Sequence, residues 1–550
     1  MGEGYKNCCT WWSSSSSSMK LLLFMVPLMI VASGFVSILG SKTSTWVVFP
    51  NHSWSSFSSS SSSETRESSA KESEEMVDLH SRMVMVGVQD KEEALLNVDQ
   101  PILNKSSSPP LPVEAVQVQQ SDGSVLEDGL KISMAETPNV APMSESVSVP
   151  MKAMRPKVLT KLEKLEAGLQ RARVAIKEAS NGNQTDPQDP DFVPPGPMYW
   201  DSKAFHRSYL EMEKQFKVFV YEEGEPPVFH DGPCKSIYSM EGNFIYAMEV
   251  SRQFRTKDPE KAQVFFLPFS VAKMVQFVYV RDSHDFGPIR RTVVDYVNLI
   301  ASRYPYWNRS LGADHFMLAC HDWGPETSFS VPNLQKNSIR ALCNANTSEK
   351  FSPMKDVSFP EINLRTGKIN GLVGGPSPSR RSILAFFAGG VHGPIRSVLL
   401  EHWENEDEDI RVQKYLPKGV SYYDMMRKSK FCLCPSGYEV ASPRVVEAIY
   451  TGCVPVLISE HYVPPFSDVL NWKSFSVEVS MSDIPNLKRI LSSISTRQYI
   501  RMYRRVVQVR RHFEFNSPPK RFDVFHMILH SIWLRRLNVR IHNDQSGVTN

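Results

Sequence analysis

The chain has 550 residues, enough for two or three domains, and its 41% hydrophobic content is ordinary for a protein with a buried core. Its formal net charge is +3, from 62 Lys and Arg residues against 59 Asp and Glu residues. Because nucleic-acid-binding proteins usually show a strong basic excess or stripe, this near-neutral balance gives no reason to expect a nucleic-acid partner.

The first 150 residues predict a membrane anchor and a stem. Residues 21–39, LLLFMVPLMIVASGFVSIL, are uncharged and long enough to span a bilayer, so we interpret them as a signal anchor after a cytoplasmic tail, residues 1–20. Cleavage near Ala32 to Gly34 is the alternative. Cys8 and Cys9 are either palmitoylated or unmodified thiols. Residues 40–153 are rich in serine and proline without sustained periodicity, which predicts a disordered stem.

Triplets of the N-x-S/T type, the acceptors for N-glycosylation, lie after the apolar segment. This placement favours a lumenal catalytic region. The five triplets begin at Asn51, Asn104, Asn183, Asn308 and Asn346.

Residues 154–180 predict an amphipathic helix. Its apolar stripe consists of Leu159, Leu162, Leu165, Leu169, Ala172 and Ala175. The stripe could pair two stems as a short coiled coil, but it is shorter than several heptads. We therefore favour a helix that is isolated or docked on the catalytic region. Residues 181–198 form a proline-rich hinge.

Residues 199–379 alternate between strand-like and helix-like patterns. Residues 218–221, 264–267 and 316–319 are apolar runs of strand length, and residues 242–254 and 290–303 have helical spacing. This order predicts an open α/β sheet.

The pattern restarts in residues 380–520. A strand at residues 383–387 precedes a loop, a helix from Pro394 and a helix from Ser421, whose spacing to Asp424 is that of a capping box. The fold class is therefore α/β, with two successive halves that leave a cleft between them. Residues 521–550 add a C-terminal helix, in which Phe525 and its helically spaced apolar neighbours should be core residues.

Residues 431–472 carry the most specific signal. An apolar strand ends at Pro435 and Gly437, Ser442 supplies an N-cap oxygen, and Pro443 takes the first helical position. A second apolar strand follows at residues 453–458, giving a strand, helix, strand crossover of a parallel sheet. Ligands of such sheets collect beyond the carboxyl ends of the strands, where helix N-termini attract anions.

Arg444 and Glu447 share one face of this helix. The guanidinium suits a diphosphate, and the carboxylate can accept two hydrogen bonds from ribose hydroxyls. The alternative is an intrahelical ion pair on a solvated surface.

The loop AGGVHGPIR has a related character. Gly389, Gly390 and Gly393 let the backbone approach a phosphate, and Arg396 in the following helix can balance its charge. A tight turn with a solvent-facing arginine is the alternative.

The run SKFCLCPSGYEVASPRVVEAIYTGCVPVLI resembles the signature of the exostosin-type glycosyltransferases, the plant members most closely. Residues 205–233, 319–325 (ACHDWGP) and 384–396 match further motifs in the family's order. One departure is Glu460, where many members carry Asp. The resemblance implies a Golgi enzyme with an inverting mechanism, two facing Rossmann-like domains, no cofactor and no catalytic metal.

His321 and Asp322 follow a strand of the first half, so they should reach the cleft. Inversion needs a general base that takes the proton of the acceptor hydroxyl, and we assign His321 or Asp322 without deciding between them. The alternative is a structural pair, in which Asp322 caps a turn and His321 packs against Trp323.

Three further features carry weaker signals. The two Asp-x-Asp strings lie in the hinge, at Asp189, and in the acidic loop ENEDED, at Asp407, and neither suits a metal.

Cys432, Cys434 and Cys453 should be buried as small hydrophobes, whereas Cys234, Cys320 and Cys343 are disulfide candidates, with Cys320–Cys343 as the guess. The arginines of residues 501–511 could hold an acidic polysaccharide, although a solvated face is the favoured interpretation.

Together these features predict transfer of a sugar from a nucleotide diphosphate donor, in the simplest case a UDP-sugar, to a cell-wall polysaccharide in the Golgi lumen. We leave open an oligomer with itself or with other glycosyltransferases. A non-catalytic scaffold subunit of such a complex is the alternative, and a secreted lectin-like binder would require cleavage of the anchor.

Overall fold

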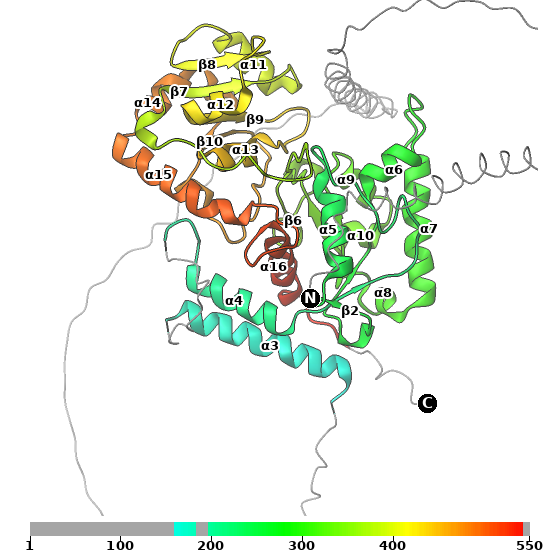
Figure 1. Ribbon diagram of the computed structural model, residues 1–550. Helices are drawn as coiled ribbons and strands as arrows, with labels where there is room; N and C mark the ends of the chain where they lie inside the picture. The colour runs from blue at the N-terminus through cyan, green and yellow to red at the C-terminus, as the bar shows by residue number, and fades with distance from the viewer. Residues whose placement is uncertain (1–158, 183–195, 543–550) are drawn as a thin grey trace, which may run out of the picture. The chain divides into compact units, whose positions relative to one another are not determined.

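Two parallel β-sheets organise the residues that the computed structural model describes, 159–182 and 196–542 (Figure 1). The expected tail, anchor, stem and most of the hinge lie outside these residues, as do Asn51, Asn104 and Asn183. Among the helices of the described ranges, none has both the length and the apolar character needed to cross a bilayer.

The first sheet has six parallel strands in the order β2-β1-β3-β4-β5-β6. Its strands are β1 (Val218–Val220), β2 (Arg255–Thr256), β3 (Val264–Phe266), β4 (His315–Ala319), β5 (Ile339–Leu342) and β6 (Val357–Ser358). Successive side chains of β3 point to opposite faces of the sheet and belong to two different hydrophobic cores. Phe265 packs with α7 (Gly287–Arg303), whereas Phe266 packs with α5 (Ser239–Val250). The sheet is therefore covered on both faces, as parallel sheets require.

The second sheet has five parallel strands in the order β11-β10-β9-β7-β8. They are β7 (Ile383–Ala388), β8 (Ile410–Gln413), β9 (Ser429–Pro435), β10 (Val454–Ile458) and β11 (Val477–Val479). Its helices are α11 (Gly393–Trp403), α12 (Tyr422–Lys428), α13 (Arg444–Thr451), α14 (Leu487–Ser492) and α15 (Thr496–Val509). The strands and helices expected from the sequence are present, and the α/β class is confirmed.

Both sheets share one winding pattern. In each, the first strand lies between the second and the third, so the chain changes its winding direction between β1 and β3 and between β7 and β9. Loops at the carboxyl ends of two such strands separate from each other and leave a crevice where ligands bind. In the second sheet these are the loops that follow β7 and β9.

Shorter helices connect the strands of the first half. They are α6 (Val271–Phe277), α8 (Pro305–Ser310), α9 (Gly324–Ser328) and α10 (Pro332–Lys336). Short 3₁₀ segments occur along the whole described chain, at Pro259–Lys261, Thr347–Glu349, Pro378–Arg380, Trp472–Ser474, Met481–Asn486 and Arg510–His512.

The predicted amphipathic helix is α3 (Lys161–Ser180), and it begins at a capping box formed by Thr160 and Glu163. It packs along α4 (Ser202–Gln215), and Figure 1 shows the two helices side by side. The Arg173 Nε group also donates to the carbonyl oxygen of Leu537 at 2.6 Å. The docked alternative is therefore confirmed.

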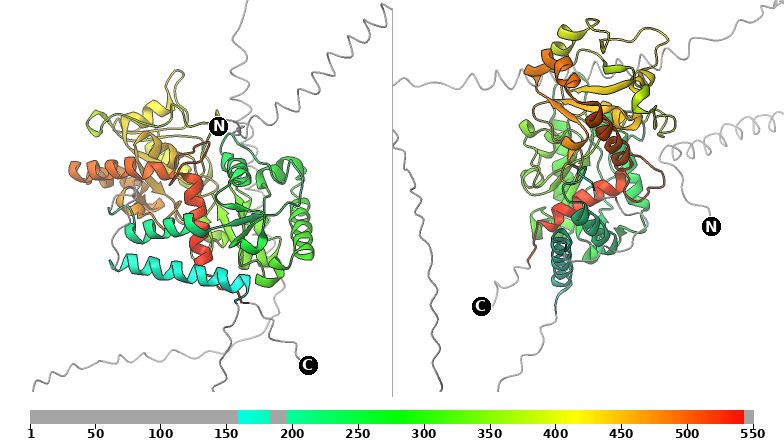
Figure 2. Two further views of the ribbon diagram at one scale, coloured as in Figure 1. Left: turned by 60° about the horizontal axis from the view of Figure 1, so that its bottom comes forward. Right: turned by 90° about the vertical axis from the view of Figure 1, so that its left-hand side faces the viewer.

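The last helix, α16 (Val524–Leu537), returns to the first half. Its apolar side chains are buried, as the sequence predicts, and it contacts β5, β6, α3 and α4. Figure 2 shows α16, in red, beside the cyan pair of α3 and α4. In the sequence, all strands of the second sheet come between β6 and α16. The chain therefore crosses to the second half after β6 and returns to the first half before α16.

Two disulfides join described cysteines to each other, and Cys234, another disulfide candidate from the sequence, is disulfide-bonded as well. Cys320–Cys343 joins the ends of β4 and β5 and confirms the guess from the sequence. Cys432–Cys453 corrects the expectation that both are buried thiols. Cys432 pairs in register with Pro455 of β10, so Cys453, two residues before Pro455, lies close to Cys432. This proximity results from the register of the sheet and could not be predicted from the spacing of the cysteines in the sequence. Cys434 is a buried thiol as expected, and burial raises its pKa to about 12.

Candidate active site

Glycines line the crevice at the edge of the second sheet. A Cβ atom on Gly389, which follows β7, would lie 2.7 Å from Arg444 Nη2, and one on Gly437, which follows β9, would lie 3.2 Å from Arg396 Nη2. A Cβ on Gly390 would lie 3.0 Å from His392 Nε2. The absence of side chains at Gly389 and Gly437 therefore makes room for two guanidinium groups.

Arg396 and Arg444, here called the arginine pair, come from α11 and α13. Arg444 donates from Nη2 to the Ala388 carbonyl at 3.1 Å, and its guanidinium lies 4.6 Å from the Phe387 ring centre. Neither arginine forms an ion pair within the described residues, and both Nε atoms are buried without an acceptor. Burial, and then the neighbouring Arg444, lower the pKa of Arg396 to about 9.

Arg396 and Arg444 are half-buried like charges, which is unfavourable because each has lost part of its hydration and repels the other, although the charge of Glu447 offsets part of this at Arg444. A ligand carrying several negative charges would supply the missing acceptors. Arginine forks match phosphate oxygens geometrically, so a diphosphate fits this pair.

Glu447 lies one helical turn after Arg444 and is only 7% exposed. Its two oxygens accept hydrogen bonds from the hydroxyls of Tyr422 at 3.1 Å and Tyr423 at 3.0 Å. Since it forms no ion pair with Arg444, the alternative of a solvated ion pair is wrong. Each carboxylate oxygen keeps a second lone pair, so binding to a ribose stays a prediction.

The helix that carries both residues begins one position later than predicted. Ser442 Oγ accepts from the backbone N–H of Arg444 at 3.4 Å, and Pro443 precedes the first helical residue. Ser442 Oγ also accepts from Arg444 Nη1 at 3.4 Å, so it helps to orient the guanidinium. The helix ends at Gly452, whose φ of +71° favours glycine.

The turn after β4 holds His321 and Asp322. Buried Glu241 of α5 fixes this turn, because its Oε1 accepts from the backbone N–H groups of Cys320 at 2.8 Å and His321 at 2.9 Å. Glu241 thus positions the predicted base residues, a role that the sequence did not reveal.

The environments of His321 and Asp322 differ. His321 is 3% exposed, and its Nδ1 accepts from the backbone N–H of Trp323 at 3.1 Å, while its ring packs against those of Tyr238 and Trp323. The ring proton is therefore on Nε2, which leaves no lone pair for a substrate proton. The packing matches the structural alternative for His321.

Asp322 is half-buried and is hydrogen-bonded by the Tyr238 hydroxyl. Burial raises the pKa values of Glu361 and Glu439 well above their usual range, and neighbouring carboxylates add to the rise: Asp322 acts on Glu361, and Glu349 and then Asp322 act on Glu439. Because the charge of Asp322 acts on both groups, Asp322, Glu361 and Glu439 are here called the carboxyl cluster.

The carboxyl cluster includes residues of both halves. Glu439 follows β9 in the second half, and its Oε2 accepts from Asn344 Nδ2, after β5 in the first half, at 2.6 Å. Glu361 also follows the first sheet, yet Arg396 and Arg444 act on its pKa and oppose the rise caused by burial. The charges of the arginine pair and of Asp322 therefore all act on Glu361.

Sequence reasoning missed Glu361 and Glu439. Glu439 lies in the GYEVASPR motif, two residues after Gly437, so the motif itself could have indicated it. Glu361 stands in FPEI, where no local pattern distinguishes it from a surface carboxylate.

The other predicted positions are distributed elsewhere. Asp407 and Asp409 bind Lys488 Nζ at 2.6 and 3.2 Å, so they serve an ion-pair network, and Asp189 lies outside the described residues. Asn308 is exposed, whereas Asn346 is 8% exposed and its Oδ1 accepts from the Ser348 backbone N–H at 3.0 Å. Glycosylation of both stays a prediction.

Comparison with known proteins agrees with this arrangement. The model of the Exostosin GT47 domain matches residues 212–494. This range contains every strand of both sheets, but not α3, α15 or α16. This chain belongs to the exostosin GT47 family. The match contains the arginine pair and the carboxyl cluster.

Relatives of this exostosin GT47 protein come from plants. An Arabidopsis thaliana protein named as a probable glycosyltransferase is 72% identical over 405 residues, which are 73% of this chain and 78% of that protein. A probable glucuronosyltransferase of Oryza sativa subsp. japonica is 29% identical over 351 residues, 58% of this chain and 81% of its own. A probable beta-1,4-xylosyltransferase of Arabidopsis thaliana is 27% identical over 348 residues, 58% of this chain and 82% of its own.

Proposed function

We propose that this exostosin GT47 protein is an inverting, metal-independent glycosyltransferase that uses a nucleoside diphosphate sugar, in the simplest case a UDP-sugar, and extends or decorates a cell-wall polysaccharide. The names of its relatives, a probable glucuronosyltransferase and a probable beta-1,4-xylosyltransferase, support transfer of a sugar. The arginine pair supports the donor: it supplies two half-buried guanidinium groups that form no ion pair within the described residues, at the topological switch point of the second sheet.

In the proposed reaction, the diphosphate of the donor binds the arginine pair and the loops at Gly389 and Gly437. Glu447, held by its two tyrosines, binds the ribose. In this proposal the anomeric carbon lies on the side of Glu361 and Asp322, because the charges of the arginine pair and of Asp322 both act on Glu361.

Asp322 is the general base in this proposal. An acceptor hydroxyl oxygen attacks the anomeric carbon while its proton moves to the Asp322 carboxylate. The bond between the anomeric carbon and the diphosphate oxygen breaks with its electron pair, and the nucleoside diphosphate leaves toward the arginine pair. Attack from the face opposite the leaving group inverts the anomeric centre.

We further propose that the apolar segment at residues 21–39 anchors the protein in the Golgi membrane as a single-pass type II protein with a lumenal catalytic region. Its uncharged length and the N-glycosylation triplets after it support this placement.

Calorimetric titration of the full chain with UDP tests the donor site. Arg396→Gln and Glu447→Ala should each weaken binding by about tenfold or more, because each removes hydrogen bonds that involve a charged group. Arg411→Gln, which removes an exposed arginine of β8, is the matched control and should leave the affinity unchanged. Equal affinity in all four proteins would refute the donor site. Tight binding without turnover on any acceptor would favour the scaffold alternative instead.

A further inference from the structure

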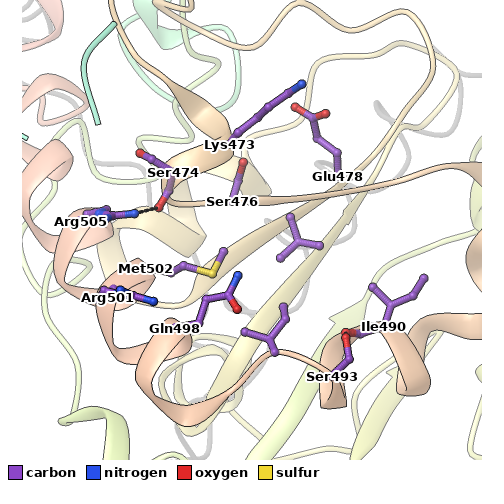
Figure 3. Close-up of a pocket in the computed structure, with 12 residues that line it drawn as sticks. Lys473, Ser474, Ser476, Glu478, Ile490, Ser493, Gln498, Arg501, Met502 and Arg505 are labelled. Carbon is purple, nitrogen blue, oxygen red and sulfur yellow. Dashed lines mark hydrogen bonds between the residues drawn. The ribbon is translucent and has the colours of Figure 1, made fainter. Parts of the chain in front are cut away.

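A cavity of about 570 Å³ lies in the second half, between α15 and the segment that runs from the 3₁₀ turn at Trp472–Ser474 into β11 (Figure 3). None of the residues that line it belongs to the arginine pair, the carboxyl cluster or the glycine loops. Its volume is within the range of sites for small ligands and is sufficient for a few sugar rings.

The cavity has a basic rim. Arg501 and Arg505 lie one turn apart on α15, and Lys473 stands on the opposite side in Figure 3. Arg505 Nη1 donates to the Ser474 carbonyl at 2.9 Å, which fixes its guanidinium against the wall. Burial, and then the charge of Arg501, lower the pKa of Arg505.

The charges of this rim are not balanced by acids of the same helix. The sequence of α15, TRQYIRMYRRVVQV, contains no Asp or Glu, and like charges four residues apart destabilise a helix. Within the described residues Arg501 has neither a hydrogen bond nor an ion pair. An anionic ligand would relieve this repulsion.

The remaining lining distinguishes a saccharide from a simple anion. Glu478 and Gln498 offer oxygen acceptors for hydroxyl groups, which a saccharide supplies in greater number than a phosphate. The floor contains Val477, Ile490, Ile494 and Met502, against which the C–H face of a sugar ring can pack.

We propose that this cavity binds a short segment of a polysaccharide that carries uronic acids, at a second saccharide site outside the transfer site. The carboxylates of the segment pair with Arg501 and Arg505, and its hydroxyls donate to Glu478 and Gln498. The proposal concerns binding alone and does not depend on sugar transfer.

Titration of the full chain with tetragalacturonate, a linear tetramer of galacturonic acid, tests the site in the absence of any nucleotide sugar. The wild type should bind, with an affinity that falls as salt rises. Arg501→Gln and Gln498→Glu, both at exposed positions, should weaken binding by about tenfold or more. Arg504→Gln is the matched control, because Arg504 is an exposed arginine of the same helix outside the cavity.

Each other outcome overturns the proposal. Equal losses in Arg501→Gln and Arg504→Gln would show diffuse attraction to the helix. Equal binding of the carboxyl-reduced, neutral tetramer would exclude recognition of the uronate. Displacement by an equal concentration of inorganic phosphate would show a simple anion site. The binding of UDP, measured separately, should be unaffected by Arg501→Gln, so failure here and failure of the donor site can be told apart.

Discussion

Arg396 and Arg444 bring two guanidinium groups from different helices to the same crevice, where each has a buried Nε without an acceptor. The charge of Arg444 contributes, after burial, to the lowered pKa of Arg396. Glu447 relieves this arrangement only in part, at Arg444, so a bound anion would stabilise it further.

Replacing Arg396 by methionine should therefore stabilise the protein without ligand and weaken its binding of UDP. Arg396→Met keeps most of the side-chain volume and removes one buried charge, so the free energy of unfolding without ligand should rise by about 0.5–2 kcal/mol. The affinity for UDP should fall at the same time. Urea unfolding with and without UDP measures both effects, and a loss of stability in the free protein would contradict the interpretation.

The two candidates for the general base should respond differently to substitution. Asp322→Asn should lower kcat by about 100-fold or more while the affinity for UDP is retained, because the base acts on the acceptor. His321→Asn keeps an acceptor near the position of Nδ1 for the Trp323 N–H group, so most of the activity should remain. A greater loss of kcat in His321→Asn than in Asp322→Asn would reverse the assignment.

The disulfide between β9 and β10 should contribute to stability. Cys432 and Cys453 are 21 residues apart, and a loop of this length predicts a loss of about 3 kcal/mol in the free energy of unfolding for the double alanine variant. Cys434→Ala, in the same strand, is the control and should cost about 1 kcal/mol. Denaturant unfolding without reductant measures the difference, and equal losses would show that the bond has no effect of its own.

His512 should make the protein less stable in acid. Its Nδ1 donates to the Phe522 carbonyl, its Nε2 accepts from the Tyr199 hydroxyl, and burial lowers its pKa to about 3. Between pH 6.5 and 3 the unfolded chain binds a proton at this residue and the native protein does not. The contribution of His512 to the free energy of unfolding is therefore fully present above pH 6.5. It decreases by about 1.4 kcal/mol for each unit by which the pH is lowered from 6.5 toward 3.

The variant His512→Asn isolates this effect from the other titrating groups. Between pH 6.5 and 5 the wild type should lose about 2 kcal/mol more than the variant, as measured by urea unfolding at both pH values. Parallel pH dependences in the two proteins would show that His512 does not titrate in this way.

Local sequence patterns predicted the strands and the helices that carry the two arginines well, because each depends on residues close together in the chain. Ser421, for example, caps α12 by accepting from the Asp424 N–H group, as the spacing indicated. Glu439 escaped prediction because it contacts Asn344, 95 residues earlier, and Glu361 because the charges that act on it come from distant segments. Similarly, the Cys432–Cys453 bond follows from sheet register, and the choice between His321 and Asp322 depends on which lone pairs the surrounding backbone occupies.

The return of α16 to the first half has a consequence for how the protein is made. The ribosome completes β1 to β6 long before it reaches Val524, the first residue of α16. Until α16 has been synthesised, the apolar surface of the first sheet that it covers stays uncovered. Nascent chains in this interval expose that surface and depend on chaperones or on rapid completion. A premature stop near residue 520 would thus damage the half of the protein that was synthesised first.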